Sequence, residues 1–163
     1  MSATNITRPR TGRAVLGLGA LALAALDLLV KTVVVETIGD GRVLDFGLFN
    51  LKLGYNTGVA LSLGATLSPW IVVVATAVIV TALAVFLFRA VPRFGTLSRA
   101  GAAFLLGGAL GNLVDRMDGA GVVDYLHTGW FPTFNLADVF VVGGVGLLIL
   151  GTILFPAARR EED

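Results

Sequence analysis

Residues 100–125 read AGAAFLLGGALGNLVDRMDGAGVVDY, an apolar run followed by three aspartates and one arginine. A hydrocarbon core about 30 Å thick is crossed by about 20 apolar residues, and this run with its first polar residues reaches that length. Ionisable side chains in or near a bilayer are costly unless they are paired or face a polar cavity. The charges at the end of the run therefore mark a candidate functional site.

The remaining sequence is equally apolar. Of the 163 residues, 56% are hydrophobic and 14% are charged. We predict an all-α membrane protein with four transmembrane helices and a small extracytoplasmic β-segment, forming one domain over residues 1–163. The spans are expected at residues 14–35, 69–88, 100–117 and 137–155.

Composition excludes several classes of function. A net charge of +1 provides no basic surface for nucleic acid. The chain has no cysteine and one histidine, which excludes thiolate chemistry and argues against a zinc cluster. We therefore expect no metal and no cofactor, and chemistry limited to carboxylate, hydroxyl, amide, lysine and arginine groups.

Basic residues predict the orientation in the membrane. Arginines occur before the first span, between the second and third, and after the fourth, namely Arg8, Arg10, Arg13, Arg89, Arg93, Arg99, Arg159 and Arg160. Cytoplasmic segments carry the excess of lysine and arginine, so both termini are expected in the cytoplasm. The connections at residues 36–68 and 118–136 then face outward, and Asp124 is expected in the loop after the third span.

The first outer connection contains VLDFGLFNLKLGYNTGVALSL at residues 43–63, and its mixture of β-formers and glycines predicts a small sheet. Within it, the sequence of residues 56–58, NTG, is also typical of a plain turn. At its end, Ser68 is expected to be the N-cap of the second span, with Pro69 at the first helical position and Trp70 at the membrane interface.

Polar residues of three spans are predicted to lie at one depth. At 1.5 Å per residue, Asp27 is roughly 20 Å into a helix that starts inside, and Lys31 follows one turn later. Asn112 falls in the last turns of the third span, with Asp115 and Arg116 nearby, and Asp138 is near the outer start of the fourth. This shared outer layer is the candidate site.

Each member of this layer also has a purely structural interpretation. Asp27 and Lys31 have the i, i+4 spacing of a helical ion pair. The sequence NLAD at residues 135–138 is typical of a capped helix start. Asp115 and Arg116 could form a surface pair at the membrane edge.

His127 and Trp130 are more typical of interfacial anchors than of ligands.

Taken together, five stretches resemble one family, bacterial lipoprotein signal peptidase, the type II signal peptidase. They are LDLLVK, YNTGVALSL, GGALGNLVDR, GVVDY and FNLAD, which begin at residues 26, 55, 107, 121 and 134. The resemblance covers the whole chain and includes four spans in this orientation. It departs from the family at Leu61 and Tyr125, where phenylalanine is expected, and in LDLLVK, which lacks polar residues between its acid and its lysine.

The resemblance implies a multi-pass aspartyl endopeptidase of the bacterial cytoplasmic membrane, active at the outer leaflet. Its substrate would be a prolipoprotein carrying diacylglycerol on a cysteine, cut immediately before that cysteine. The implied catalytic pair is Asp124 and Asp138. The implied substrate-binding or supporting residues are Asp27, Lys31, Asn56, Gly108, Asn112, Arg116, Asn135 and Ala137. Membrane lipid is the other expected partner, and we expect a monomer.

The residues themselves agree with this chemistry. Two neighbouring carboxyl groups do not both ionise easily, so one can act as base and the other as acid around a water molecule. Three alternatives stay open: a small transporter or channel subunit, a serine protease with Ser62 as nucleophile and Lys31 as base, and a non-cleaving member of the same family.

Overall fold

The computed structural model describes residues 9–58 and 68–155 of the chain. Four helices occur in it: α1 (Pro9–Ile38), α2 (Pro69–Ala90), α3 (Thr96–Arg116) and α4 (Leu136–Leu154). A 3₁₀ turn, η2 (Val91–Arg93), links α2 to α3. All four helices are long and apolar enough to cross a membrane, so the prediction of four spans is confirmed. The first helix is longer at both ends than expected.

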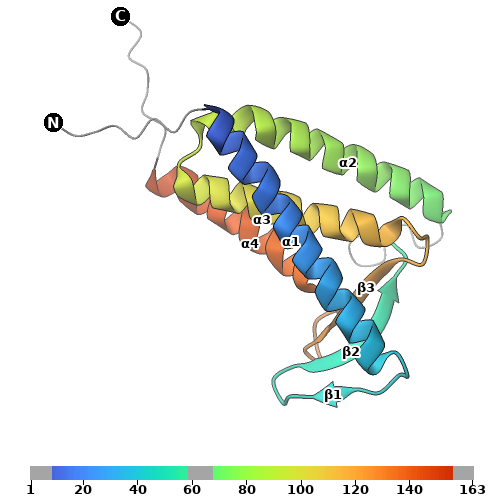
Figure 1. Ribbon diagram of the computed structural model, residues 1–163. Coiled ribbons are helices and arrows are strands. Elements are labelled where there is room, and N and C mark those ends of the chain that lie inside the picture. The colour runs from blue at the N-terminus through green and yellow to red at the C-terminus, as the bar shows by residue number, and fades with distance from the viewer. Residues whose placement is uncertain (1–8, 59–67, 156–163) are drawn as a thin grey trace, which may run out of the picture.

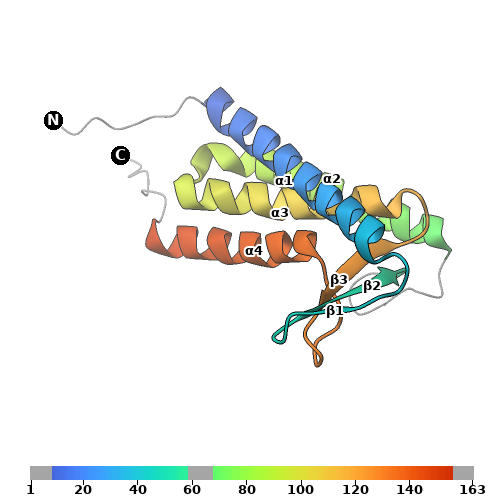
Figure 2. The same cartoon turned by 60° about the horizontal axis from the view of Figure 1, so that its bottom comes forward.

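The bundle is organised around α3, which packs against α4, α1 and α2 (Figures 1 and 2). Small residues allow α3 and α4 to approach backbone to backbone. A Cβ at Gly101 would lie 2.6 Å from the Leu148 nitrogen, and one at Gly108 would overlap the Ala137 carbonyl oxygen. Helices in membranes associate closely through such small residues. The start of α4 is therefore held directly against α3.

An antiparallel sheet lies beyond one end of the bundle (Figure 1). Its strands are β1 (Leu44–Asp45), β2 (Asn50–Asn56) and β3 (Val122–His127), in the order β1-β2-β3. The predicted β-segment is confirmed for β1 and β2. The expectation that Asp124 lies in a loop is wrong, because Asp124 is in β3 opposite Gly54 of β2. Pairing with β2 gives this six-residue segment its strand conformation.

The two parts are joined by the C-terminal end of α1. In the bundle, Leu16 and Ala20 of α1 belong to a core shared with α2 and α3. Further along, Val34 and Ile38 pack against Val123 and Tyr125 of β3 in a second core. The additional length of α1 thus supports the sheet that carries Asp124.

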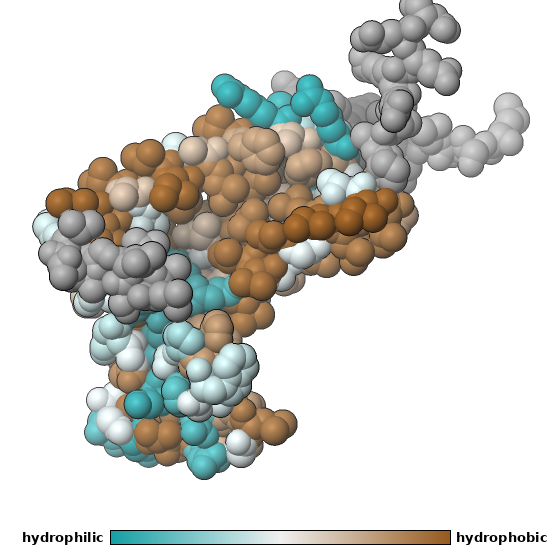
Figure 3. Space-filling view, turned by 180° about the vertical axis from the view of Figure 1, so that it is seen from behind, coloured by the Kyte–Doolittle hydropathy of each residue, from teal (hydrophilic) through white to brown (hydrophobic). Residues whose placement is uncertain are grey.

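Surface residues divide in the same way. Figure 3 shows hydrophobic residues over the helical part of one face, with hydrophilic and hydrophobic residues mixed over the sheet and hydrophilic residues at the opposite end. At that opposite end, Arg13 Nε donates to the carbonyl oxygen of Phe88 at 3.1 Å.

The start of α2 differs in one detail from its prediction. Ser68 is the N-cap and Pro69 begins the helix, but the Ser68 side chain makes no capping hydrogen bond.

Candidate active site

Lys31 is at the centre of the polar layer. It is 2% exposed, and its ammonium nitrogen is 2.9 Å from Asp27 Oδ2, 3.1 Å from Asp115 Oδ2 and 3.0 Å from Asn112 Oδ1. An ammonium group has three N–H donors and no acceptor. One contact is a hydrogen bond to Asn112 and two are ion pairs, so the predicted Asp27–Lys31 pair is part of a larger network.

The contact with Lys31 also fixes the orientation of the Asn112 amide. Because the ammonium group only donates, the Asn112 atom that faces it is the oxygen. The amide nitrogen then points the other way and donates to Asp138 Oδ1 at 2.8 Å. Lys31 thereby determines which hydrogen-bonding group Asn112 presents to Asp138.

Asn135 performs the corresponding role for Asp124 while capping α4. Its Oδ1 accepts from the Asp138 backbone nitrogen at 3.0 Å, and Asp138 Oδ2 accepts from the Asn135 backbone nitrogen at 3.1 Å. This is the capped helix start predicted from NLAD. The Asn135 amide nitrogen remains free to donate to Asp124 Oδ1 at 2.7 Å and to Asn112 Oδ1 at 3.2 Å.

Asp124 and Asp138 are therefore joined through two amides, in the order Asp124, Asn135, Asn112, Asp138. Asp124 is 6% exposed. Burial raises the pKa of Asp124 to about 6, against the lowering effect of the hydrogen bond from Asn135. The charge of Asp138 raises this pKa further, and a hydrogen bond from Asn56 lowers it. The charge of Asp138 therefore acts on Asp124.

Asp27 connects α1 to the start of α4. Its Oδ1 accepts from the Ala137 backbone nitrogen at 2.9 Å, which satisfies one of the free N–H groups of the first helical turn. The carboxylate fits beside α3 because residue 111 is glycine: a Cβ there would lie 2.6 Å from Asp27 Oδ2. Gly108 of α3 lies directly against the backbone of Ala137, and this close contact holds the first turn of α4 against α3.

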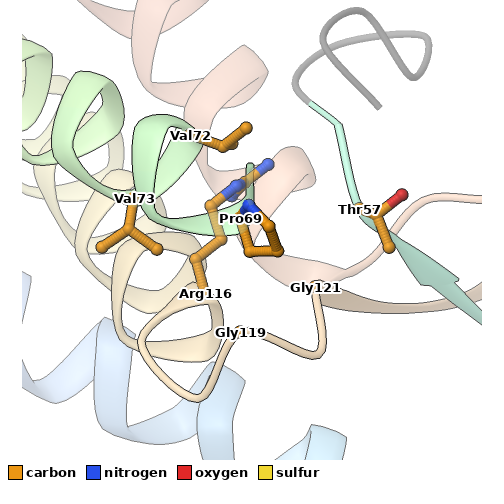
Figure 4. Close-up of a pocket in the computed structure, with 7 residues that line it drawn as sticks. All are labelled: Thr57, Pro69, Val72, Val73, Arg116, Gly119 and Gly121. Carbon is orange, nitrogen blue, oxygen red and sulfur yellow. The ribbon is translucent and has the colours of Figure 1, made fainter. Parts of the chain in front are cut away.

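Arg116 binds backbone rather than carboxylates. Its Nη1 donates to the Asn112 carbonyl oxygen and its Nη2 to the Gly58 carbonyl oxygen, both at 3.0 Å. It lines a small pocket in which the side chain extends from α3 past Pro69, with Thr57 opposite (Figure 4). Arg116 thus ties the segment after β2 to α3.

The sequence NTG does form a turn, in which Asn56 Oδ1 accepts from the Gly58 nitrogen at 3.1 Å.

All ten residues implied by the resemblance lie in this connected cluster. Among residues 9–58 and 68–155, no group of three or more His, Cys, Asp or Glu side chains is placed to hold a metal ion. Ser62 and Leu61 lie outside the described residues. His127 has its Nδ1 3.3 Å from the Thr133 hydroxyl, and Trp130 is exposed.

Comparison with known proteins identifies the family. The sequence model of signal peptidase (SPase) II matches residues 19–154. The chain belongs to the signal peptidase II family. As a signal peptidase II it is a hydrolase and a membrane aspartic peptidase, in agreement with the resemblance seen in the sequence.

Individual relatives support the same assignment. A lipoprotein signal peptidase of Neisseria meningitidis serogroup C / serotype 2a is 36% identical over 155 residues, covering 88% of this chain and 91% of the relative. That of Actinobacillus succinogenes is 35% identical over 163 residues, covering 96% and 99%. A solved structure described as a bacterial membrane enzyme has a TM-score of 0.73 and 25% identity, covering 92% of this chain and 94% of that one.

One residue of this signal peptidase II site, Gly111, was not anticipated, and a second, Asp115 of the predicted polar layer, has partners that the sequence did not indicate. Gly111 is needed because Asp27 packs closely against it. In the sequence, its place directly before Asn112 was the feature that could have indicated this role. Asp115 does not pair with Arg116 at the surface, as one interpretation had it. It contacts Lys31 and the Val123 nitrogen instead.

Tyr125 is 3% exposed and packs in the core under the sheet. Burial raises its pKa to about 12, so it stays neutral.

Proposed function

We propose that this signal peptidase II removes signal peptides from prolipoproteins with a water molecule activated by Asp124 and Asp138. The observation that carries the proposal is the amide chain Asp124, Asn135, Asn112, Asp138. It orients two carboxyl groups from different elements toward one place. Positioned groups of this kind replace a poorly oriented encounter by an ordered one.

We assign the initial base to Asp138. Both of its oxygens accept hydrogen bonds, from the Asn112 amide and from the Asn135 backbone nitrogen, as a carboxylate does. Asp124, whose pKa burial raises to about 6, carries the shared proton.

In the first step, Asp138 takes a proton from water as the water oxygen bonds to the scissile carbonyl carbon. Asp124 gives its proton to the carbonyl oxygen, which produces a neutral tetrahedral diol. In the second step, the C–N bond breaks, Asp138 returns its proton to the leaving nitrogen, and Asp124 recovers a proton from the diol. The products are a new carboxyl terminus and a new amino terminus.

The transport alternative is not favoured. A path across the bilayer would place polar groups along the bundle, whereas the buried network of Lys31, Asp27 and Asp115 occupies only its sheet end. The non-cleaving alternative predicts loss of an acid from the pair, and both acids are present.

Orientation and substrate form the second part of the proposal. The arginines at the start of α1, the end of α2 and the start of α3 lie at the end opposite the sheet, which supports cytoplasmic termini and a site at the outer leaflet. A diacylglyceryl cysteine would rest at that leaflet and hold the scissile bond at the depth of the pair.

Because all members of the site come from one chain, we propose a monomer. A reporter fused after Arg93 should read cytoplasmic, and one inserted near Gly129 should read external.

The test is cleavage of a purified precursor followed by gel shift. Asp124→Asn and Asp138→Asn should each abolish cleavage while remaining folded, with Asp118→Asn on the exposed loop as the active control. The diacylglyceryl-modified precursor should be cut, with or without chelator, and the unmodified precursor left largely intact. Full processing by either catalytic variant would refute the pair, and equal cleavage of both precursors would refute recognition of the lipid.

A further inference from the structure

Asp115 makes two contacts that the proposed reaction does not itself use. It lies on α3, one turn after Asn112, and its side chain is 13% exposed. Its Oδ2 accepts from the Val123 backbone nitrogen at 2.7 Å and lies 3.1 Å from Lys31 Nζ. We propose that Asp115 is a positioning residue, which fixes the backbone of β3 so that Asp124 meets its partner.

The hydrogen bond between Asp115 and the Val123 nitrogen lies directly beside Asp124 on β3. β3 is the last strand of the sheet and pairs with β2 on one side only. Next to Asp124, the Val123 nitrogen is bound by Asp115 and the Tyr125 nitrogen by the Phe134 carbonyl oxygen at 3.0 Å. Asp124 is thus flanked by two bonded amides on its own strand and is paired with Gly54 of β2.

The hydrogen bonds of the catalytic pair tolerate little displacement of β3. Asp124 Oδ1 is 2.7 Å from the Asn135 amide, and a displacement of about 1 Å would take this pair out of hydrogen-bond range. A backbone N–H held by a carboxylate is among the stronger hydrogen bonds, so Asp115 restrains β3 more firmly than a neutral acceptor would.

Both acids of the pair also share one anchor. Through Lys31, Asp115 is connected to Asn112, which faces Asp138; through Val123, it is connected to the strand of Asp124. The same carboxylate therefore sets the position of both halves of the pair. This inference rests on the proposed catalytic role of Asp124 and Asp138.

Three substitutions separate the acceptor from the charge. Asp115→Asn keeps an oxygen that can accept from both Val123 and Lys31, so it should retain kcat to within about tenfold. Asp115→Leu has similar size and no acceptor, and should lower kcat by about 100-fold with KM changed less than about threefold. Asp115→Glu keeps the charge but displaces the carboxylate, so its kcat should fall below that of the Asn variant.

The matched control is Asp118→Leu. Asp118 is an exposed aspartate in the next turn that also accepts a backbone hydrogen bond, at 2.8 Å, but from the nitrogen of Ala120, which lies outside β3. Its loss should leave kcat unchanged. Hydrogen–deuterium exchange should show faster exchange at the Val123 amide in the Leu variant and not in the Asn variant, with the helices equally protected in all variants.

Measurements use the full-length enzyme in lipid, on a diacylglyceryl-modified precursor, with Asp124→Asn in parallel. Wild-type kcat in a folded Leu variant would overturn the inference, and so would equal losses in the Asn and Leu variants. If the Leu variant does not fold, an Asn variant no more active than the Glu variant would overturn it. Cleavage by Asp124→Asn would instead overturn the catalytic pair, so the two failures are distinguishable.

Discussion

Two ion pairs with the same distance occur in different regions of the molecule. Lys31 Nζ is 2.9 Å from Asp27 Oδ2 inside the bundle, and Arg42 Nε is 2.9 Å from Asp40 Oδ2 in the connection between α1 and β1. The first pair has side-chain exposures of 3% and 0%, the second of 58% and 56%. The distance is the same, but the surroundings determine what each pair contributes.

In the exposed pair, water solvates each charge whether or not the partner is present. Hydrogen bonds from Arg42 lower the pKa of Asp40, yet exposed pairs of this kind stabilise proteins little. In the buried pair, water cannot replace a missing partner. Removal of one charge leaves the other uncompensated in an apolar bundle.

The largest effect is expected from Lys31→Met. It leaves Asp27 and Asp115 without their cation and removes the donor that orients Asn112, so it should cost about 3–5 kcal/mol of stability. Cleavage should fall with it. Thermal unfolding and steady-state cleavage in the same lipid would measure both, with Lys52→Met on an exposed position of β2 as control.

A double variant sharpens this prediction. Asp27→Leu combined with Lys31→Met should recover part of the stability, because an apolar replacement of a whole buried pair is often tolerated. It should not recover cleavage. Equal losses in Lys31→Met and Lys52→Met would break the comparison.

An intermediate effect is expected from pH, through Asp124. Its pKa is about 6 in the folded protein against an ordinary value of 3.8, so the folded state binds this proton more tightly. The stabilisation is complete below the ordinary value and is lost as pH rises through about 6. Asp124→Asn cannot lose it, and should gain up to about 3 kcal/mol relative to wild type between about pH 4 and about pH 8. The prediction would be contradicted if the free energies of unfolding of wild type and Asp124→Asn changed with pH in the same way across this range.

The smallest effect is expected from Arg42→Gln. Both partners are exposed, so the midpoint of thermal unfolding and kcat should not change measurably. The same instruments and lipid as for Lys31→Met make the two results directly comparable. A clear loss of stability would mean that exposure does not govern these pairs.

Sequence predicted those features that depend on neighbouring residues. Apolar length gave the four spans, and NLAD gave the capped start of α4 together with Asp138 at its third position. The i, i+4 spacing correctly paired Asp27 with Lys31. Each of these follows from periodicity or helix-end chemistry within a few residues.

Contacts between distant segments could not be predicted in this way. Asp115 and Arg116 are adjacent in sequence, but adjacent side chains on a helix do not face each other, and the partner of Asp115 comes from α1. β3 forms because β2 pairs with it. Its residues Val122, Val123 and Tyr125 favour a strand, but they do not indicate which segment it pairs with. The family resemblance supplied Asp124, whereas its strand required the structure.

The contact between Asp115 and β3 also affects how other extended chains can meet the sheet. An edge strand ordinarily offers free backbone groups on which a further strand can add. Here the Val123 N–H donates to the Asp115 side chain, and the N–H groups of Tyr125 and Leu126 donate to the Phe134 carbonyl oxygen. At the other edge, β1 is only two residues long. An extended peptide beside Asp124 would therefore have to displace Asp115 or Phe134 to join the sheet, so backbone pairing at these positions is closed to substrate and to unfolded neighbours alike.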